Sequence, residues 1–198
     1  MPPLIEPVGL RLVLGGNVFG WTADLDTGFA ILDAFYEAGG RMIDTAEGYS
    51  AFVPGLVGGE SETVLGQWMA ARCNRAEMHI ATKTGMYGKP GDLNPAKLAA
   101  AVEGSLKRLQ TDYIDLYYAH RDETATDQAE AAQGFGALVT AGKVRTLGAS
   151  NFTADRLATA RAAAKAQGVA AYVAIQNEYN LVVRNQFEGD VQDMCVAE

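Results

Sequence analysis

The stretch RMIDTAEGYS, residues 41–50, joins a short apolar run to a carboxylate and a phenol. The run RMI is typical of a buried strand, and the preceding EAGG is typical of a helix end with a glycine stop. Asp44 stands where the strand leaves the core, and Tyr49 follows on the loop. These two side chains are either ordinary loop polarity or half of an active site, and the rest of the chain decides between the two.

Apolar runs of the same kind recur along the chain at similar intervals. The predicted strands are LRLVLGG (10–16), RMIDTA (41–46), MHIATKTG (78–85), YIDLYYAH (113–120), VRTLGAS (144–150) and YVAIQNEYN (172–180). Their starts lie 31, 37, 35, 31 and 28 residues apart, and amphipathic segments of helical length fill the intervals. Strands and helices that alternate at this spacing predict βαβ units and a parallel sheet.

The predicted helices have recognisable ends. Asn94 before Pro95 is an N-cap followed by proline at the first helical position. Three glycines fall where helices should stop, namely Gly39, Gly142 and Gly168. A sixth helix is predicted from about Gln186 to the last residue, Glu198.

Two architectures fit this pattern, a doubly wound open sheet and a closed (β/α)₈ barrel. Six strands favour the open sheet, because a barrel has eight units and about 250 residues. The polar residues favour the barrel, because five successive strands end in them and all strand ends of a barrel face one mouth. These residues are Asp44, Lys83, His120, Ser150 with Asn151, and Gln176. LGGNVFG, after the first strand, also lacks the Gly-x-Gly-x-x-Gly spacing of a dinucleotide fingerprint. We therefore predict a barrel of which about six units are present, as one incomplete domain over residues 1–198.

Composition narrows the classes of function. The chain has 198 residues, of which 48% are hydrophobic and 20% charged, and its net charge is −8. This charge argues against binding to nucleic acid or to an anionic membrane surface. Cys73 and Cys195 match no metal-ligand spacing, so we predict two reduced thiols and no metal site. No leader-like or membrane-spanning apolar run is visible, which predicts a cytoplasmic protein.

Each candidate residue has a structural and a functional interpretation. Lys83 ends an apolar strand and needs a partner such as Asp44. In the structural interpretation the two residues form an ion pair and do nothing more. Tyr49 alone would be a packing tyrosine, but beside a lysine its pKa would fall and make it a proton donor. His120 is either a core histidine or a group that orients a substrate oxygen. We interpret His79, at the other end of its strand, as structural.

Ser150, Asn151 and Gln176 offer uncharged donors and acceptors of the kind that hold an amide. A nicotinamide carboxamide would suit them, as would many other ligands. Their position on consecutive strand ends is the stronger part of the argument.

Five blocks, IDTAEGYS, IATKTG, DYIDLYYAH, GKVRTLGASNF and IQNEYNL, resemble the aldo-keto reductase superfamily in their order and spacing. The likeness extends from about Leu10 to the end of the chain, and is greatest to the bacterial branch related to potassium-channel β subunits. The resemblance implies a (β/α)₈ barrel that binds extended NADPH without a Rossmann domain, with NADH as the open alternative.

The resemblance also implies roles for individual residues. Tyr49 would protonate a carbonyl oxygen while hydride reaches the carbonyl carbon. Lys83, held by Asp44, would lower the tyrosine pKa, and His120 would position the oxygen. The residues implied to contact the cofactor are Gly16, Asn17, Asp44, Ser150, Asn151 and Gln176. Aldehydes or ketones would be reduced to alcohols.

The chain departs from the family at its end, DMCVAE, which falls inside the sixth predicted helix. Family members continue with two further βα units, which carry an aromatic that stacks on the nicotinamide and the residues that bind the 2′-phosphate. Three explanations stay open: a fragment of a longer protein, which we favour; a natural truncation; or a barrel completed by a partner chain. A homo-oligomer also stays open.

Two other classes of function compete with a carbonyl reductase. A non-catalytic or regulatory module is suggested by the missing half of the cofactor site, although retention of all four buried polar residues argues against it. A hydrolase or lyase with Lys83 as a Schiff base is disfavoured, because no carboxylate pair or metal cluster is evident.

Overall fold

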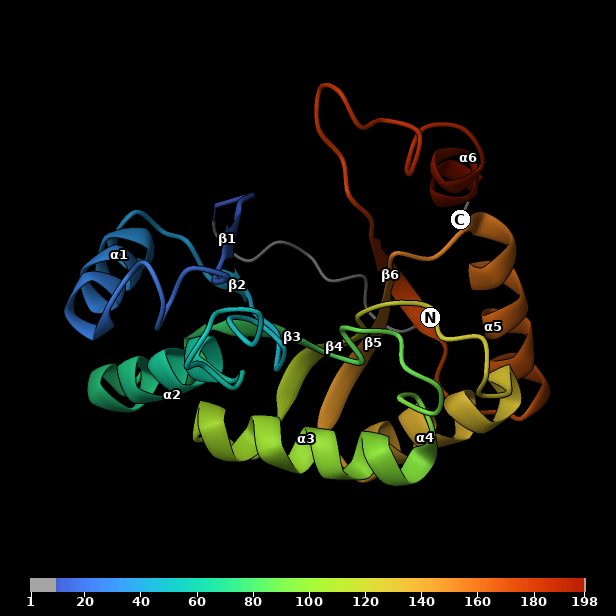
Figure 1. Ribbon diagram of the computed structural model, residues 1–198, viewed down its shortest axis with the longest axis horizontal. Helices are drawn as coiled ribbons and strands as arrows, with labels where there is room; N and C mark the ends of the chain where they lie inside the picture. The colour runs from blue at the N-terminus through green and yellow to red at the C-terminus, as the bar shows by residue number, and fades with distance from the viewer. Residues whose placement is uncertain (1–9, 198) are drawn as a thin grey trace.

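The sheet of the protein has six parallel strands, which follow one another in chain order. The computed structural model describes residues 10–197. The strands are β1 (Val13–Gly15), β2 (Met42–Asp44), β3 (His79–Thr84), β4 (Ile114–Ala119), β5 (Val144–Ser150) and β6 (Tyr172–Gln176). Figure 1 shows that the sheet curls into a half-barrel that is open between β1 and β6.

Helices alternate with the strands and lie on the outside of the curl (Figure 1). They are α1 (Leu25–Glu37), α2 (Glu60–Arg72), the 3₁₀ turn η1 (Arg75–Glu77), α3 (Pro95–Leu109), α4 (Gln128–Thr140), α5 (Ala154–Ala166) and α6 (Asp190–Ala197). The Asn94 side chain caps α3 by accepting a hydrogen bond from the Lys97 N–H at 2.9 Å. Gly39, Gly142 and Gly168 have positive φ after their helices, as their positions predicted.

The strand order distinguishes the two architectures that the sequence left in competition. In a doubly wound sheet the order reverses at a switch point, and helices cover both faces. Here the order runs from β1 to β6 without reversal, and α1 to α5 lie outside the curl (Figure 1). The prediction of a partial (β/α) barrel with six units is therefore confirmed.

Three predicted boundaries are wrong. The first strand is three residues long, because β1 is an edge strand that pairs with β2 only over Val13–Gly15. The last strand ends at Gln176, where its pairing with β5 ends. The sixth helix begins at Asp190 and not at Gln186, because Gly189 has a φ of +91° and closes a turn before the helix. The predicted end of that helix, Glu198, lies outside the described residues.

The main hydrophobic core fills the space between the sheet and the outer helices. Its largest members are buried completely or nearly so, among them Trp68, Tyr117, Phe135, Leu98 and Leu32. A second, smaller cluster of Ala81, Leu116 and Tyr118 forms apart from it, with Met42 and Ala174 packed against it.

This smaller cluster shares a face of the sheet with the candidate lysine. The register pairs Lys83 of β3 with Tyr118 of β4, and Tyr118 with Gly148 of β5. Residues paired in this way point to the same side of a sheet. The concave face is therefore mainly apolar where it carries Lys83, so the ammonium group needs a partner close to its strand.

Helices α2 and α3 approach each other most closely at Gly66. A Cβ atom added there would lie 2.1 Å from the carbonyl oxygen of Arg108, which is too close for any side chain. We expect Gly66→Ala to lower the free energy of unfolding by about 1–3 kcal/mol, because the helices must separate. Urea denaturation measures the difference. Gly104→Ala in α3 is the control, since its Cβ would meet only the movable guanidinium of Arg108; equal stability of both variants would contradict the prediction.

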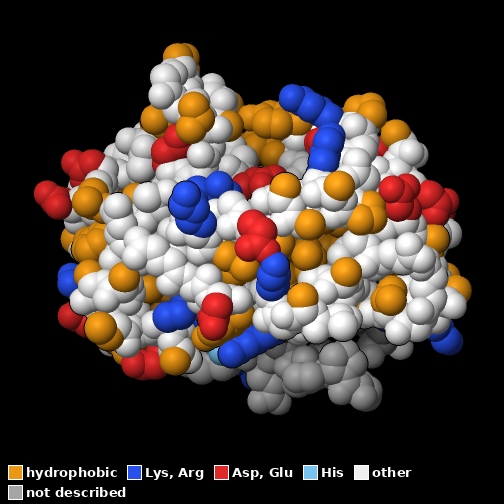
Figure 2. Space-filling model, turned by 90° about the horizontal axis from the view of Figure 1, so that it is seen from below, with side chains coloured by type: hydrophobic (Ala, Val, Ile, Leu, Met, Phe, Trp, Pro, Cys, Tyr) orange, Lys and Arg blue, Asp and Glu red, His pale blue; other side chains and the backbone are white. Residues whose placement is uncertain are grey.

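The surface seen from below carries both signs of charge. Figure 2 shows Lys and Arg side chains interspersed with Asp and Glu side chains and with apolar ones on this face. None of the helices within residues 10–197 is long and apolar enough to cross a membrane.

Candidate active site

Asp44, Lys83 and Tyr49 meet at the carboxyl ends of β2 and β3. The Lys83 Nζ atom lies 2.7 Å from Asp44 Oδ2 and 2.8 Å from the Tyr49 hydroxyl oxygen, and donates to the Thr45 carbonyl at 2.9 Å. The Tyr49 hydroxyl donates to Asp44 Oδ2 at 3.3 Å. Lys83 is 1% exposed, so its charge depends on these partners. The predicted partnership of Lys83 with Asp44 is therefore present, and Tyr49 joins it.

A tight turn after β2 brings Tyr49 back over the strand ends. The Tyr49 N–H donates to the Ala46 carbonyl at 3.3 Å, and Ser50 follows with a φ of +69°. Serine seldom adopts a left-handed conformation, and such strain persists where the surrounding structure fixes it. The turn thereby places the phenol next to the lysine five residues after Asp44.

His120 lies on the other side of Tyr49, directly after β4. The two rings are in an edge-to-face arrangement with centroids 5.9 Å apart. Within residues 10–197 the buried Nδ1 atom of His120 has no hydrogen-bond partner. A buried nitrogen without a partner is costly, so it is a group that a ligand could satisfy.

The charges around Tyr49 act against the expected change in its pKa. Burial raises the pKa of Tyr49 above its ordinary value, and the negative charge of Asp44 and the hydrogen bond to it raise it further. The predicted net fall in the pKa of Tyr49 is therefore not found, because the burial of the phenol and the negative charge of Asp44 outweigh the effect of the paired Lys83 charge. Burial also lowers the pKa of Lys83, against the opposing effect of Asp44. Tyr49 is consequently a protonated phenol at neutral pH.

The pKa of His120 predicts how the fold responds to acid. Burial, followed by the positive charges of Lys83 and Arg121, lowers this pKa from 6.5 to about 4. Between these pH values the unfolded chain binds a proton that the folded chain does not. We therefore expect the free energy of unfolding to fall by up to about 3 kcal/mol as the pH drops from 6.5 to 4, through His120 alone.

The His120→Asn variant should lose this component of the acid sensitivity. Urea denaturation at several pH values between neutral and acid measures it, with His79→Asn, at the opposite end of β3, as the matched control. An unchanged pH dependence in His120→Asn would show that the histidine is not the responsible group.

Ser150, Asn151 and Gln176 lie together across the ends of β5 and β6. The Ser150 hydroxyl donates to the Gln176 carbonyl at 2.6 Å, and the Asn151 amide group donates to Ser150 Oγ at 3.1 Å. The same Asn151 nitrogen donates to the His120 carbonyl at 2.8 Å. Part of the hydrogen-bonding capacity of Asn151 and Ser150 is thus used within the protein. Gln176 is only partly buried, and its side-chain amide makes no hydrogen bond within residues 10–197.

Gly16 and Asn17 follow β1 at the same end of the sheet. The Gly16 N–H donates to the Asp44 carbonyl at 2.7 Å, and its own carbonyl accepts from Ser61 Oγ at 2.7 Å. A Cβ on Gly16 would lie 3.0 Å from both oxygens, so a side chain at this position would have to displace its neighbours slightly. Asn17 is exposed. The structure therefore places Gly16 against the residue that holds Lys83, and leaves Asn17 open to solvent.

Two glutamates behind the site are absent from the sequence-based prediction, the buried Glu62 and the partly buried Glu47. Glu47 accepts from the Thr84 hydroxyl, and Glu62 accepts from the Thr82 hydroxyl and pairs with Arg108. A signal for them exists in the sequence T-K-T at 82–84, because residues flanking Lys83 must point to the opposite face. Hydroxyls on that face need acceptors, and nearby glutamates are the candidates.

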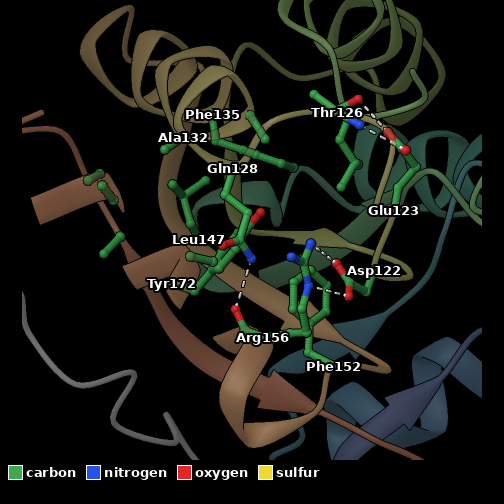
Figure 3. Close-up of a pocket in the computed structure, with 16 residues that line it drawn as sticks. Asp122, Glu123, Thr126, Gln128, Ala132, Phe135, Leu147, Phe152, Arg156 and Tyr172 are labelled. Carbon is green, nitrogen blue, oxygen red and sulfur yellow. Dashed lines mark hydrogen bonds and ion pairs between the residues drawn. The ribbon is translucent and has the colours of Figure 1, made fainter. Parts of the chain in front are cut away.

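A small pocket between α4, α5 and the loop after β4 lies apart from this site (Figure 3). Its cavity volume of about 20 Å³ is enough for a single water molecule. Arg156 forms a two-pronged ion pair with Asp122 there, at 2.7 and 2.9 Å. Asp122 is two residues after His120, so this pair fixes the loop that follows the histidine.

A family model and several curated proteins match the sequence of the chain. The family model described as "Aldo/keto reductase family" matches residues 11–198. Norsolorinic acid reductase B of Aspergillus parasiticus is 37% identical over an alignment of 196 residues that covers 94% of this chain and 49% of that protein. The aryl-alcohol dehydrogenase [NADP(+)] of Phanerodontia chrysosporium is 35% identical over an alignment of 190 residues that covers 89% of this chain and 47% of that protein.

The chain spans about half the length of the curated relatives it matches. Within that span it has the six successive βα units and the cluster of Asp44, Tyr49, Lys83 and His120 at one mouth. The family model covers nearly all of it. The chain belongs to the aldo/keto reductase family.

Proposed function

We propose that the protein is an NADPH-dependent reductase that converts aldehydes and ketones to alcohols, with Tyr49 as the proton donor. The observation that carries this proposal is the position of the Tyr49 hydroxyl, 2.8 Å from a buried ammonium group that Asp44 holds at 2.7 Å. A phenol that gives up its proton becomes an anion. A cation already in place stabilises that anion without reorganisation.

The protonation states of His120 and Tyr49 indicate which of the two is the general acid. The pKa of His120 is lowered to about 4, so at neutral pH its ring is uncharged and is not a strong acid. Tyr49 has a raised pKa and carries a proton that it donates to the carbonyl oxygen as negative charge develops there. Lys83 then stabilises the tyrosinate, and an uncharged His120 orients the carbonyl oxygen. NADPH, when bound, supplies the hydride that completes the alcohol.

The residues at the mouth fit the nicotinamide end of this cofactor. Gln176 presents a side-chain amide without a partner among the described residues, and amide-to-amide hydrogen bonds suit a carboxamide. Ser150 and Asn151 stand next to it and are held in place by the ends of β4 and β6. We infer that these three residues hold the carboxamide and that Gly16 and Asn17 contact the adjoining ribose. NADPH is preferred to NADH in the proposal because one relative is named for NADP(+).

An aromatic pair near the site indicates the class of carbonyl. Trp21 and Phe52 pack edge to face with ring centroids 5.3 Å apart, and are 44% and 54% exposed. They lie on the loops after β1 and β2, at the same end of the sheet as Tyr49. Two relatives are named for norsolorinic acid and for aryl alcohols. We infer that aryl aldehydes or ketones are the substrates.

Steady-state kinetics with NADPH and NADH test the proposal. We expect kcat/KM for benzaldehyde to exceed that for an alkyl aldehyde by about tenfold, the effect of one aromatic contact. Trp21→Ala should remove most of this preference. Failure to oxidise NADPH or NADH with any aldehyde would refute the reductase function, whereas an equal rate with both aldehydes would refute only the aryl preference.

The two cysteines bear on the location of the protein. Cys73 and Cys195 are free thiols on the surface, which suits the reducing cytoplasm where NADPH is abundant. We propose a cytoplasmic enzyme with a small-molecule carbonyl substrate.

A further inference from the structure

Glu47, two residues before Tyr49, connects the loop after β2 to the end of β3. Its carboxylate oxygen Oε1 accepts from the Thr84 hydroxyl at 2.5 Å and from the Gly85 N–H at 3.2 Å. Its backbone N–H donates to the Lys83 carbonyl at 3.1 Å. One residue of the tyrosine loop is thus hydrogen-bonded to three consecutive residues, of which the first is the candidate lysine.

This connection is important because successive side chains of β3 point to opposite faces of the sheet. Lys83 points to Asp44 and Tyr49, whereas Thr84 points to the opposite face and reaches Glu47. The strand therefore carries the ammonium group on one face and is held by a carboxylate on the other. Movement of Thr84 relative to Glu47 would move Lys83 relative to Tyr49.

Two other contacts join the backbone of the loop to β3 and to the segment that follows it. The Thr45 N–H donates to the Ala81 carbonyl at 2.8 Å, at the start of the loop. At Gly48 an added Cβ would lie 2.6 Å from the sulfur of Met86, so the backbone packs directly against the segment after β3. This packing limits how closely the loop approaches the segment after β3, but it does not fix the distance between Tyr49 and Lys83. The hydrogen bonds of Glu47 are directional, and they are the last ones along the loop before Tyr49.

A carboxylate is a costly choice for this position. Burial raises the pKa of Glu47, and the hydrogen bonds from Thr84 and Gly85 oppose that rise. An apolar side chain would fill the same space without the desolvation cost. The feature that only the polar side chain provides is a fixed geometry at two donors.

We propose that Glu47 is a positioning residue, whose carboxylate joins the Tyr49 loop to the strand that carries Lys83 and thereby sets the distance between the phenol and the ammonium group. The inference rests on the proposed reductase function of Tyr49. Glu47 touches neither the substrate nor the cofactor in this account, and acts through Tyr49 and Lys83 alone.

The test compares Glu47→Ala, Glu47→Gln and Thr84→Val in aldehyde reduction with NADPH. Glu47→Ala should lower kcat by about 10- to 100-fold, the effect of a small misplacement of reacting groups. The KM for the aldehyde and the Kd for NADPH should change by no more than about twofold, since binding groups are untouched. Glu47→Gln keeps the accepting oxygen and should recover most of kcat. Glu60→Gln is the matched control, because Glu60 accepts from Val57 and Gly58, farther along the same loop.

Thr84→Val removes the donor in place of the acceptor, and it serves as the test should Glu47→Ala fail to fold. It should lower kcat to a similar extent, and the double variant should lose no more than the larger single loss, because one connection is broken in all cases. Wild-type kcat in Glu47→Ala or in Thr84→Val, or losses that multiply in the double variant, would overturn the proposal.

A crystal structure of Glu47→Ala separates this proposal from the proposed function. It should show the Tyr49 hydroxyl displaced from Lys83 Nζ, whether or not the protein reduces aldehydes. An unchanged distance would overturn the positioning role. Absence of aldehyde reduction in the wild-type protein would instead refute the reductase function.

Discussion

Replacement of Tyr49 by phenylalanine should lower kcat for aldehyde reduction by about 10²–10⁴-fold, the usual contribution of a positioned general acid. Phenylalanine retains the ring that packs against His120 at 5.9 Å, but has no proton to donate. Lys83 keeps Asp44 and the Thr45 carbonyl as partners. The substitution therefore removes chemistry and leaves the surroundings in place.

Stability and cofactor binding provide the controls for this variant. The Kd for NADPH, measured by quenching of the fluorescence of Trp21 and Trp68, should stay within about twofold. Tyr36→Phe is the matched control, because its hydroxyl bonds to Glu77 on the outer surface at 2.6 Å. Wild-type turnover in Tyr49→Phe would exclude the phenol as the proton donor.

The second large effect is expected from Lys83→Met. Methionine keeps the length and apolar character of the stem but leaves Asp44 without its cation. Asp44 is 7% exposed, and the loss of one partner from a buried ion pair typically costs about 3–5 kcal/mol. We expect a loss of that size in the free energy of unfolding at neutral pH, measured by urea denaturation. Turnover should fall as well, because nothing then stabilises the tyrosinate.

The double variant Lys83→Met with Asp44→Asn separates stability from chemistry. An amide needs no cation, so most of the lost stability should return. Turnover should not return, because the site still lacks its ammonium group. Recovery of turnover in the double variant would mean that Lys83 serves the fold alone, and wild-type stability of Lys83→Met would mean that the pair is not a buried one.

The arrangement of strands could be predicted from the sequence because each strand carries its own signal. VRTLGAS pairs with a neighbouring strand on each side, and β5 occupies all of it, residues 144–150. In LRLVLGG only Val13–Gly15 are strand, because an edge strand is as long as its pairing with one neighbour. Hydropathy reports burial and does not report the register of a neighbouring strand.

The contact of Lys83 with Asp44 could be predicted in the same way, because a buried charge requires a partner on an adjacent strand end. The raised pKa of Tyr49 could not, since it depends on the burial of the phenol and on the nearby charge of Asp44, to which the phenol donates. The role of Glu47 also depends on a turn that brings its carboxylate back to Thr84, 37 residues further along the chain. Such contacts are properties of loop geometry, which no local pattern specifies.

The most direct test of the account is to follow the hydride and the proton separately. The protein is given an aryl aldehyde and NADPH that carries two deuterium atoms at C4 of the nicotinamide, and the alcohol is examined by mass spectrometry. We predict one deuterium on the carbinol carbon, formed by the wild-type protein and by Tyr36→Phe but hardly at all by Tyr49→Phe. An alcohol without deuterium, or equal labelling at an equal rate in Tyr49→Phe, would contradict hydride transfer with Tyr49 as the acid.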